Sequence, residues 1–155
     1  MKVDDADVLD VIRRSMVARI ATLSRNRRPS INPLYFVSPQ GHLWLGTSDW
    51  TLAARNVRAD ARVSVLFNVE RDPTQQRVLR ISGRAEVCTD PQIVRSYNLL
   101  VARKYILTPV GITNAMAHLW QIPLKLTYNA QWAEKGQACV IAIIPERAEF
   151  LTNPS

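Results

Sequence analysis

Residues that commonly bind metals or form disulfides are scarce in this sequence, which has two cysteines and two histidines in 155 residues. Cys88 and Cys139 lie in apolar, strand-like runs, and neither has another cysteine or a histidine nearby at metal-ligand spacing. His42 and His118 are equally isolated. We therefore predict no metal site and expect both cysteines to be buried, reduced thiols.

Long apolar runs are also missing, since none approaches the roughly 20 residues that span a bilayer. The first residues, MKVDDADVLDVIRR, are acidic, whereas a secretory signal starts basic and continues apolar. We expect a cytoplasmic protein without a membrane partner. The 47% hydrophobic content is enough for a core, and the length predicts that residues 1–155 form a single domain.

Sequence motifs for side-chain catalysis are absent. The chain has no nucleophile elbow, Walker loop, GxGxxG, HExxH or Cys-X-X-Cys motif, and no carboxylate pair stands out on one predicted element. We therefore expect no catalytic side chain of the acid, base or nucleophile type. If the protein is an enzyme, a bound cofactor must supply the chemistry.

Acidic residues are outnumbered: 20 Lys and Arg against 13 Asp and Glu give a net charge of +7. Such a charge attracts phosphate groups in nucleic acids, membranes or a cofactor, and a generally basic surface is the alternative explanation. The basic residues are dispersed from Arg13 to Lys104, and aromatic residues make up only 7% of the chain. Nucleic-acid binding on an aromatic and basic platform is therefore not expected.

Hydrophobic periodicity predicts short strands interrupted by brief helices. Helices are predicted at residues 5–16 and 51–59 and, after the start signal Asp90-Pro91, along a stripe that includes Tyr97 and Lys104. Strands are predicted at residues 18–24, 29–37, 42–47, 62–68, 77–87 and 138–144, with 147–151 as a short partner strand after Pro145. Residues 105–136 show no clear pattern, apart from a helical turn or two at 115–121.

These elements lack the strand-helix-strand regularity of a parallel sheet, so they indicate a mainly β, antiparallel barrel with short helices around it. Pro33 cannot donate a ladder hydrogen bond, and strand 29–37 is therefore expected at a sheet edge or with a bulge. Strand 138–144 is apolar on both faces and is expected to be an inner strand. The edge at 29–37 and the two-sided strand at 138–144 both favour a symmetric dimer.

One segment has the composition of an anion site. A strand delivers Thr47 and Ser48 to the start of a predicted helix that carries Arg55 and Arg58. The free N–H groups and the positive end of a helix dipole attract a phosphate, hydroxyl groups add donors, and arginine adds a forked charge. The alternative is an ordinary capped helix with a solvated arginine face.

Several segments together resemble a known family. In order they are ARIATLS, PSINPLYFV, HLWLGTS and ARNVRADARVSVLF, which begin at residues 18, 29, 42 and 54. This series is similar to the split-barrel flavoproteins related to pyridoxamine-phosphate oxidase and to the F420-dependent reductases. The likeness covers about residues 8–87, with RNVRADARV at 55–63 as its most specific piece, and residues 141–147 resemble the family's closing strand and turn.

The resemblance implies an antiparallel split β-barrel, mainly β with short peripheral helices, and a homodimer with the cofactor at the subunit interface. It implies that the flavin ring lies against the second strand, near Asn32, Pro33, Leu34 and Tyr35. It implies that the ribityl-phosphate end lies near Thr47, Ser48, Arg55 and Asn56. Many members carry a phosphate-binding lysine where this chain has Ala53, so Arg55 or Arg58 would have to compensate.

By this resemblance the chain is expected to be an oxidoreductase that uses FMN or the deazaflavin F420 to transfer hydride to a small organic substrate. The acidic tail of F420 suits a basic protein, which favours F420 slightly. The alternative is a non-catalytic protein that binds a cofactor, haem or another tetrapyrrole, because the missing lysine weakens the phosphate site. Haem is the least favoured of these ligands.

Overall fold

The computed structural model describes residues 2–69, 77–106 and 137–151 of the chain. Its helices are α1 (Ala6–Arg14), α2 (Leu52–Ala59) and α3 (Pro91–Ile106), and a short 3-10 turn, η1, spans Pro39–Gly41. Its strands are β1 (Ala18–Leu23), β2 (Pro29–Leu34), β3 (Phe36–Val37), β4 (Leu43–Ser48), β5 (Arg62–Phe67), β6 (Val78–Cys88) and β7 (Ala138–Leu151). The helical turn predicted at 115–121 lies outside the described residues.

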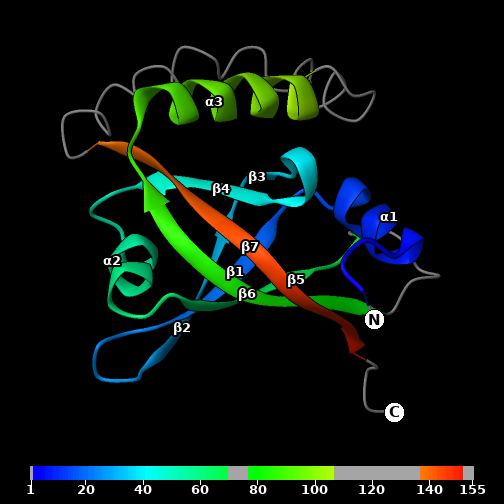
Figure 1. Ribbon diagram of the computed structural model, residues 1–155, viewed down its shortest axis with the longest axis horizontal. Helices are drawn as coiled ribbons and strands as arrows, with labels where there is room; N and C mark the ends of the chain where they lie inside the picture. The colour runs from blue at the N-terminus through cyan, green and yellow to red at the C-terminus, as the bar shows by residue number, and fades with distance from the viewer. Residues whose placement is uncertain (1, 70–76, 107–136, 152–155) are drawn as a thin grey trace, which may run out of the picture.

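The strands form one antiparallel sheet of seven strands in the order β2-β1-β5-β6-β7-β4-β3. β2 and β3 therefore stand at opposite edges of the sheet, although only Tyr35 separates them in the chain. Because one residue spans only about 3.3–3.6 Å, the sheet has to curl until its two edges come together. The result is the predicted split β-barrel, and Figure 1 shows the curl.

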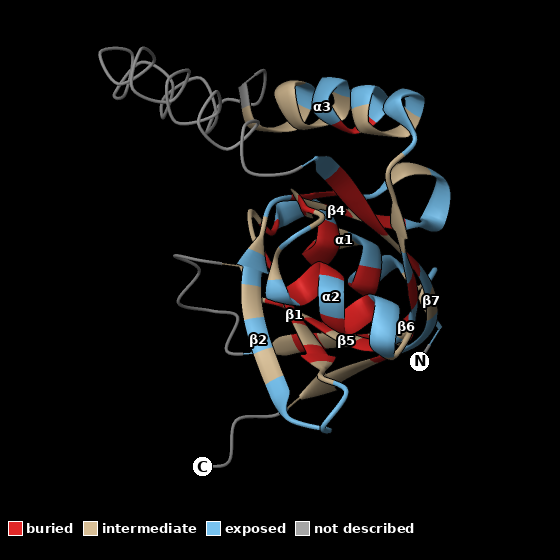
Figure 2. Ribbon diagram, turned by 90° about the vertical axis from the view of Figure 1, so that its left-hand side faces the viewer, coloured by how far each residue is buried: buried red, intermediate tan, exposed pale blue. Residues whose placement is uncertain are grey.

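The hydrophobic core fills the inside of the curled sheet, as the buried residues of Figure 2 show. Along β1, β5 and β6 buried residues alternate with less buried ones, as the period of two in the sequence predicts. The largest fully buried side chains include Phe36, Phe67, Ile20, Leu43, Leu45, Leu79, Ile81, Ile141 and Ile143. Burial of each such side chain contributes roughly 1.5–3 kcal/mol to folding, so this core is the main source of stability.

The helices cover the ends and one side of the barrel. α1 and α2 lie at opposite ends, and each turns an apolar face inward (Figures 1 and 2). α3 lies outside, where Tyr97 packs against Val37 of β3 and Val140 of β7. None of the helices in the described ranges is long and apolar enough to cross a membrane.

The predicted strand 29–37 is interrupted at Tyr35. Its first part, β2, pairs with β1, whereas its last two residues form β3 and pair with β4 on the other side of the split. The interruption lies two residues after Pro33, and β2 is an edge strand, as the proline predicted. The strand breaks where the chain crosses from one edge of the sheet to the other, so tertiary structure sets the position of the break.

The last strand corrects a second expectation. Residues 147–151 do not form a separate partner strand, because β7 continues through Pro145 and pairs with β6 on both sides of it. Ser82 faces Arg147 and Gly83 faces Pro145, so Glu146 is the extra residue of a β-bulge. The bulge interrupts the ladder next to the proline, which has no N–H to donate.

Strand β7 is an inner strand, as predicted, and the chain itself covers one of its apolar faces and part of the other. Ile141 and Ile143 face the barrel core, while Val140 on the other face packs beneath Tyr97 of α3. Ile144, at the end of the same outward row, is 62% exposed, so α3 covers this face only in part. The edge strand β2 and this exposed part of β7 therefore both remain as the basis of the dimer expectation.

Both cysteines are free thiols, and burial distinguishes them. Cys139 is buried as expected, and its surroundings raise the pKa of the thiol to about 11, chiefly through desolvation. Cys88 is only half-buried, and partial desolvation also raises its pKa. Neither thiol is therefore activated as a nucleophile.

The bulge supplies a test of this fold. A Cβ on Gly83 would collide with the carbonyl oxygen of Ile144, and a main-chain oxygen in a sheet cannot move aside. We expect Gly83→Ala to lower the free energy of unfolding by about 1–3 kcal/mol in urea denaturation. Ser82→Thr, which also adds one carbon on the same strand, should change it by less than about 0.5 kcal/mol. Equal effects of the two substitutions would contradict the close approach at Gly83.

Candidate cofactor site

The start of α2 is built from hydroxyl groups. Thr51 caps the helix: its Oγ1 accepts from the N–H of Ala54 at 3.4 Å and donates to the carbonyl of Ser48 at 2.9 Å. Thr47 Oγ1 lies 2.9 Å from Thr51 Oγ1. Because the single hydroxyl hydrogen of Thr51 goes to Ser48, Thr47 must be the donor in this pair. The predicted phosphate ligand Thr47 therefore braces the helix cap.

Donors for an anion remain at this helix end. Within the described residues, the N–H groups of Leu52 and Ala53 have no hydrogen-bond partner, and they lie at the positive end of the dipole of α2. Arg55 is exposed one turn further along, and its guanidinium has no partner in the same part of the chain. Arg58, by contrast, donates through Nη1 to the carbonyl of Asp49 at 3.0 Å. Arg55 is thus the arginine best able to meet an anion here.

Asn56, another predicted phosphate ligand, points into the protein. Its side chain is 4% exposed, and Nδ2 donates to Thr22 Oγ1 at 3.0 Å and to Ser30 Oγ at 3.2 Å. The two hydroxyls lie 3.1 Å from each other. Asn56 therefore ties α2 to β1 and β2, which holds the predicted phosphate end next to the predicted ring strand. Sequence alone assigned it a contact with the cofactor and missed this link.

The four residues predicted to face the ring divide between two sides of β2. Asn32 and Leu34 point inward, and Leu34 packs against the core. Pro33 and Tyr35 point outward, and the Tyr35 side chain is 60% exposed. Alternate residues of a strand face opposite ways, so a flat ring can meet one of these pairs or the strand backbone, but not all four side chains.

Asn32 holds a buried acceptor without a partner. Among the buried side-chain polar atoms of the described residues, Asn32 Oδ1 has no hydrogen-bond partner. An orphaned acceptor of this kind costs about 1–3 kcal/mol, unless something outside the described chain donates to it. Flavin and deazaflavin rings both carry an N–H group, so this residue fits such a cofactor.

Ala53 occupies a packed position. It is 2% exposed and belongs to the core cluster, along with Val57 one turn further on. The side chain at position 53 therefore points toward the barrel, and alanine fills that space without a charge. The donors at this helix end are accordingly the backbone N–H groups and Arg55.

Sequence reasoning treated the α3 stripe as packing and missed its polar contacts with the break between β2 and β3. Tyr97 Oη donates to the carbonyl of Tyr35 at 3.1 Å, and the N–H of Gly46 donates to the same oxygen at 3.2 Å. Tyr105 Oη donates to the carbonyl of Met16 at 2.5 Å and accepts from the N–H of Phe36 at 3.3 Å. The available signal was the polar groups of Tyr97 and Lys104 on a mostly apolar stripe, with Tyr105 directly after them.

Lys104 completes this group. Its Nζ lies 3.4 Å from the carbonyl of Phe36 and 3.3 Å from the centroid of the Phe36 ring. Burial lowers the pKa of Lys104 to about 8, because desolvation disfavours the ammonium. Burial also raises the pKa of Tyr105 to about 12 and raises that of Tyr97 further. Both phenols stay neutral and keep donating at any physiological pH.

Comparison with known proteins places these features in a family. The sequence model described as pyridoxamine 5'-phosphate oxidase matches residues 5–152. A search of curated proteins finds no match. The described ranges contain no group of three or more His, Cys, Asp and Glu residues placed to hold a metal ion.

Solved structures share the fold at low sequence identity. A conserved hypothetical protein from Mycobacterium tuberculosis aligns at a TM-score of 0.70 and 18% identity, over 100% of this chain and 92% of that one. An F420 reductase aligns at 0.62 and 19% identity, over 90% and 94%. HupZ from Group A Streptococcus aligns at 0.59 and 17% identity, over 95% and 93%. At these identities the likeness shows the fold alone.

The buried amine of α3 gives a test by pH. Its pKa falls from 10.5 in the unfolded chain to about 8 in the folded protein, so between these values the unfolded state binds more protons. Stability should therefore rise with pH across this window, relative to a Lys104→Met variant. Urea denaturation at pH 7, 8, 9 and 10 measures the difference. Arg103→Met, on the exposed side of α3, should leave the profile unchanged, and a flat difference for Lys104→Met would mean that the cation–π contact with Phe36 outweighs burial.

Proposed function

Since the chain belongs to the pyridoxamine 5'-phosphate oxidase family, we propose that it is an oxidoreductase that binds FMN or F420 and transfers hydride to a small organic substrate. A bound flavin or deazaflavin supplies the redox chemistry itself, and the protein supplies binding, orientation and a dry surface. The absence of a catalytic motif from the sequence agrees with this division of labour. The family match over residues 5–152 carries the proposal.

The residues of the chain have distinct tasks in this proposal. The N–H groups of Leu52 and Ala53, together with Arg55, bind the phosphate of the cofactor at the start of α2. Asn32 Oδ1 accepts a hydrogen bond from an N–H group of the ring, which satisfies its buried acceptor. Asn56 holds these two parts together through Ser30 on β2. No acid or base from the side chains is needed for the hydride step.

F420 is the favoured cofactor. Its tail is acidic, and a net charge of +7 attracts it at long range. One of the similar solved structures is an F420 reductase, which agrees with this preference. FMN makes the same contacts at its phosphate, so the two cofactors differ chiefly in what the tail adds.

A second candidate function is a non-catalytic protein that carries a cofactor or a tetrapyrrole. The observation that favours it is the state of the phosphate end, where Ala53 replaces a lysine and Thr47 is engaged with Thr51. Both features reduce the donors that would hold a cofactor tightly. Haem is the weaker candidate within the described residues, where His42 lies exposed at the end of η1; His118 lies outside them.

We also propose that two copies associate through the outer side of β2. This strand is a sheet edge, and Ile31 on it and Tyr35 directly after it point outward, with 59% and 60% of their surface exposed. Pro33 lies between them on the same side. An edge strand with large apolar side chains is a surface that proteins normally cover, and a symmetric copy covers it on both chains at once.

Arg55 provides the test of the phosphate end. A charge-assisted contact of this kind is worth about 1.5–3 kcal/mol, so Arg55→Ala should weaken FMN or F420 binding by roughly ten- to a hundredfold in calorimetric titration. The fold should persist, because an exposed arginine adds little stability.

Arg103→Ala is the matched control, since it removes one exposed arginine from a different helix and causes the same change in net charge. It should leave both affinities unchanged. If the wild-type protein binds neither cofactor, the proposed function fails. If it binds and Arg55→Ala has no effect, only the position of the phosphate is wrong.

Light scattering tests the association. We expect a mass of about twice the 17.5 kDa of the chain at micromolar concentration. Ile31→Glu should shift the protein toward the monomer, because a carboxylate on β2 would be buried against the copy. Leu99→Glu changes a side chain that is 68% exposed on α3 and should leave the mass unchanged. A monomeric wild-type protein would rule out the shared site.

A further inference from the structure

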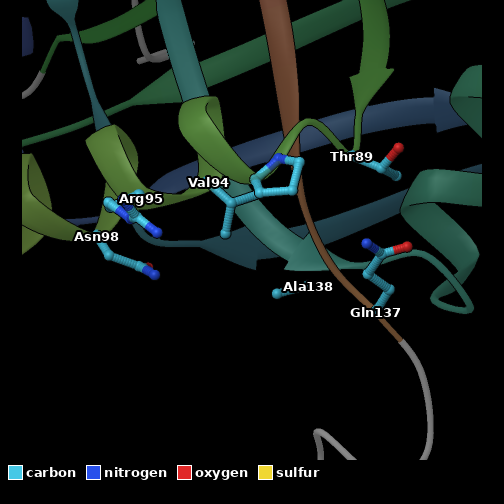
Figure 3. A pocket seen from close by; sticks show the side chains of 7 residues that line it. Thr89, Val94, Arg95, Asn98, Gln137 and Ala138 are labelled. Atoms are coloured by element: carbon cyan, nitrogen blue, oxygen red, sulfur yellow. The ribbon is translucent and has the colours of Figure 1, made fainter.

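A hollow of about 330 Å³ lies between the start of α3 and the start of β7. Its walls come from two segments far apart in the sequence, one with Thr89, Pro91, Val94, Arg95 and Asn98 and the other with Gln137 and Ala138. Figure 3 shows Arg95 and Asn98 on one side, Thr89 and Gln137 on the other, and Val94 and Ala138 between them. None of these residues belongs to the proposed cofactor site.

The polar side chains around this pocket are left without partners by the described part of the chain. Across the described ranges, the side chains of Thr89, Arg95, Asn98 and Gln137 form no hydrogen bond or ion pair. They offer a guanidinium, two amides and a hydroxyl that all border one space. The nearest acidic residue in sequence, Asp90, accepts from the N–H of Gln92 at 2.9 Å and so serves the first turn of α3.

The main chain holds the two walls in place. Gln137 and Asp49 exchange hydrogen bonds: Asp49 N–H donates to the Gln137 carbonyl at 2.9 Å, and Gln137 N–H donates to Asp49 Oδ1 at 3.1 Å. The Gln137 backbone is thus used, and its side-chain amide is left for the pocket. On the other wall, α3 is anchored through Tyr97, whose ring is buried against Val140.

The charges around the pocket and its apolar surface restrict the kind of ligand that it can bind. Arg95 favours an anion with two oxygens in a plane, which matches the fork of its guanidinium. Asp49 places a negative charge behind Gln137, and this disfavours a group with more than one negative charge at that end. Pro91, Val94 and Ala138 form an apolar base, which an inorganic ion would leave uncovered.

We propose that this pocket binds a small organic acid whose carboxylate meets Arg95 and Asn98 and whose apolar body covers Val94 and Ala138. Its volume lies at the low end of the roughly 300–1,000 Å³ typical of ligand pockets, which suits a molecule the size of one aromatic ring. The pocket is made without Asn32, Arg55 or any other residue of the proposed cofactor site. The proposal for this pocket therefore does not depend on the proposed redox function.

Nuclear magnetic resonance with three probes tests this assignment on the full chain. Benzoate should shift the side-chain amide signals of Asn98 and Gln137 and saturate on the order of 1 mM, as expected for a ligand of nine heavy atoms. Benzamide has the same shape without the charge, and inorganic phosphate has charge without an apolar body. Both should bind at least tenfold more weakly than benzoate.

Variants locate the effect. Arg95→Gln should weaken benzoate binding at least tenfold, while Arg103→Gln on the same helix and Arg55→Gln at the cofactor site should leave it unchanged. The assignment is overturned if benzoate causes no saturable shift at concentrations up to about 20 times the expected dissociation constant of about 1 mM. It is also overturned if benzamide or phosphate binds as well as benzoate. It is equally overturned if Arg95→Gln and Arg103→Gln behave alike.

Discussion

The chain passes from one edge of the sheet to the other at Tyr35, and the rest of the structure depends on how this residue is held. Its carbonyl accepts two hydrogen bonds, one from the N–H of Gly46 on β4 and one from Tyr97 on α3. Each is worth about 1 kcal/mol net, and losing both would leave a partly buried carbonyl without a partner. Gly46 is required here because a Cβ would overlap the Tyr97 ring.

This crossing explains the position of α3. The helix adds little to the barrel core, yet its tyrosines reach the backbone at Tyr35, Phe36 and Met16, where the regular ladder is interrupted. At Tyr35 the hydroxyl of Tyr97 adds a second hydrogen bond to the one from Gly46 of β4, and at Phe36 and Met16 the Tyr105 hydroxyl supplies a partner for the backbone. The same anchoring places the first turns of α3 beside the start of β7, where the organic-acid pocket lies.

The candidate cofactor site follows from the same arrangement. Because the sheet splits after β2, this strand keeps a free edge and turns Asn32 inward, next to the polar group formed by Thr22, Ser30 and Asn56. Asn56 then links β2 to α2 by hydrogen bonds, so the position of the helix depends on that of the strand. The same arrangement therefore links the strand that carries the unpaired Asn32 acceptor to the helix that carries the free N–H groups, as the proposed cofactor site requires.

The sequence by itself determined the class of fold and most of its elements. Alternation in β1, β5 and β6 and the start signal Asp90-Pro91 are local, so they can be recognised without the structure. Pro33 correctly marked an edge, because a missing N–H excludes a central strand wherever the chain folds. The segment at the start of α2 was proposed as an anion site from residue types alone, and the structure shows that Arg55 is exposed there.

Tertiary structure alone decided the remaining features, because each depends on residues distant in sequence. The break at Tyr35 follows from Tyr97 and Gly46, and the passage of β7 through Pro145 follows from a bulge opposite Gly83. The inward turn of Asn56 depends on hydroxyls 26 and 34 residues away. A sequence reports what a side chain can do, whereas its partner is chosen by the packing of the whole chain, and that packing assigned Asn56 to the link between α2 and β2.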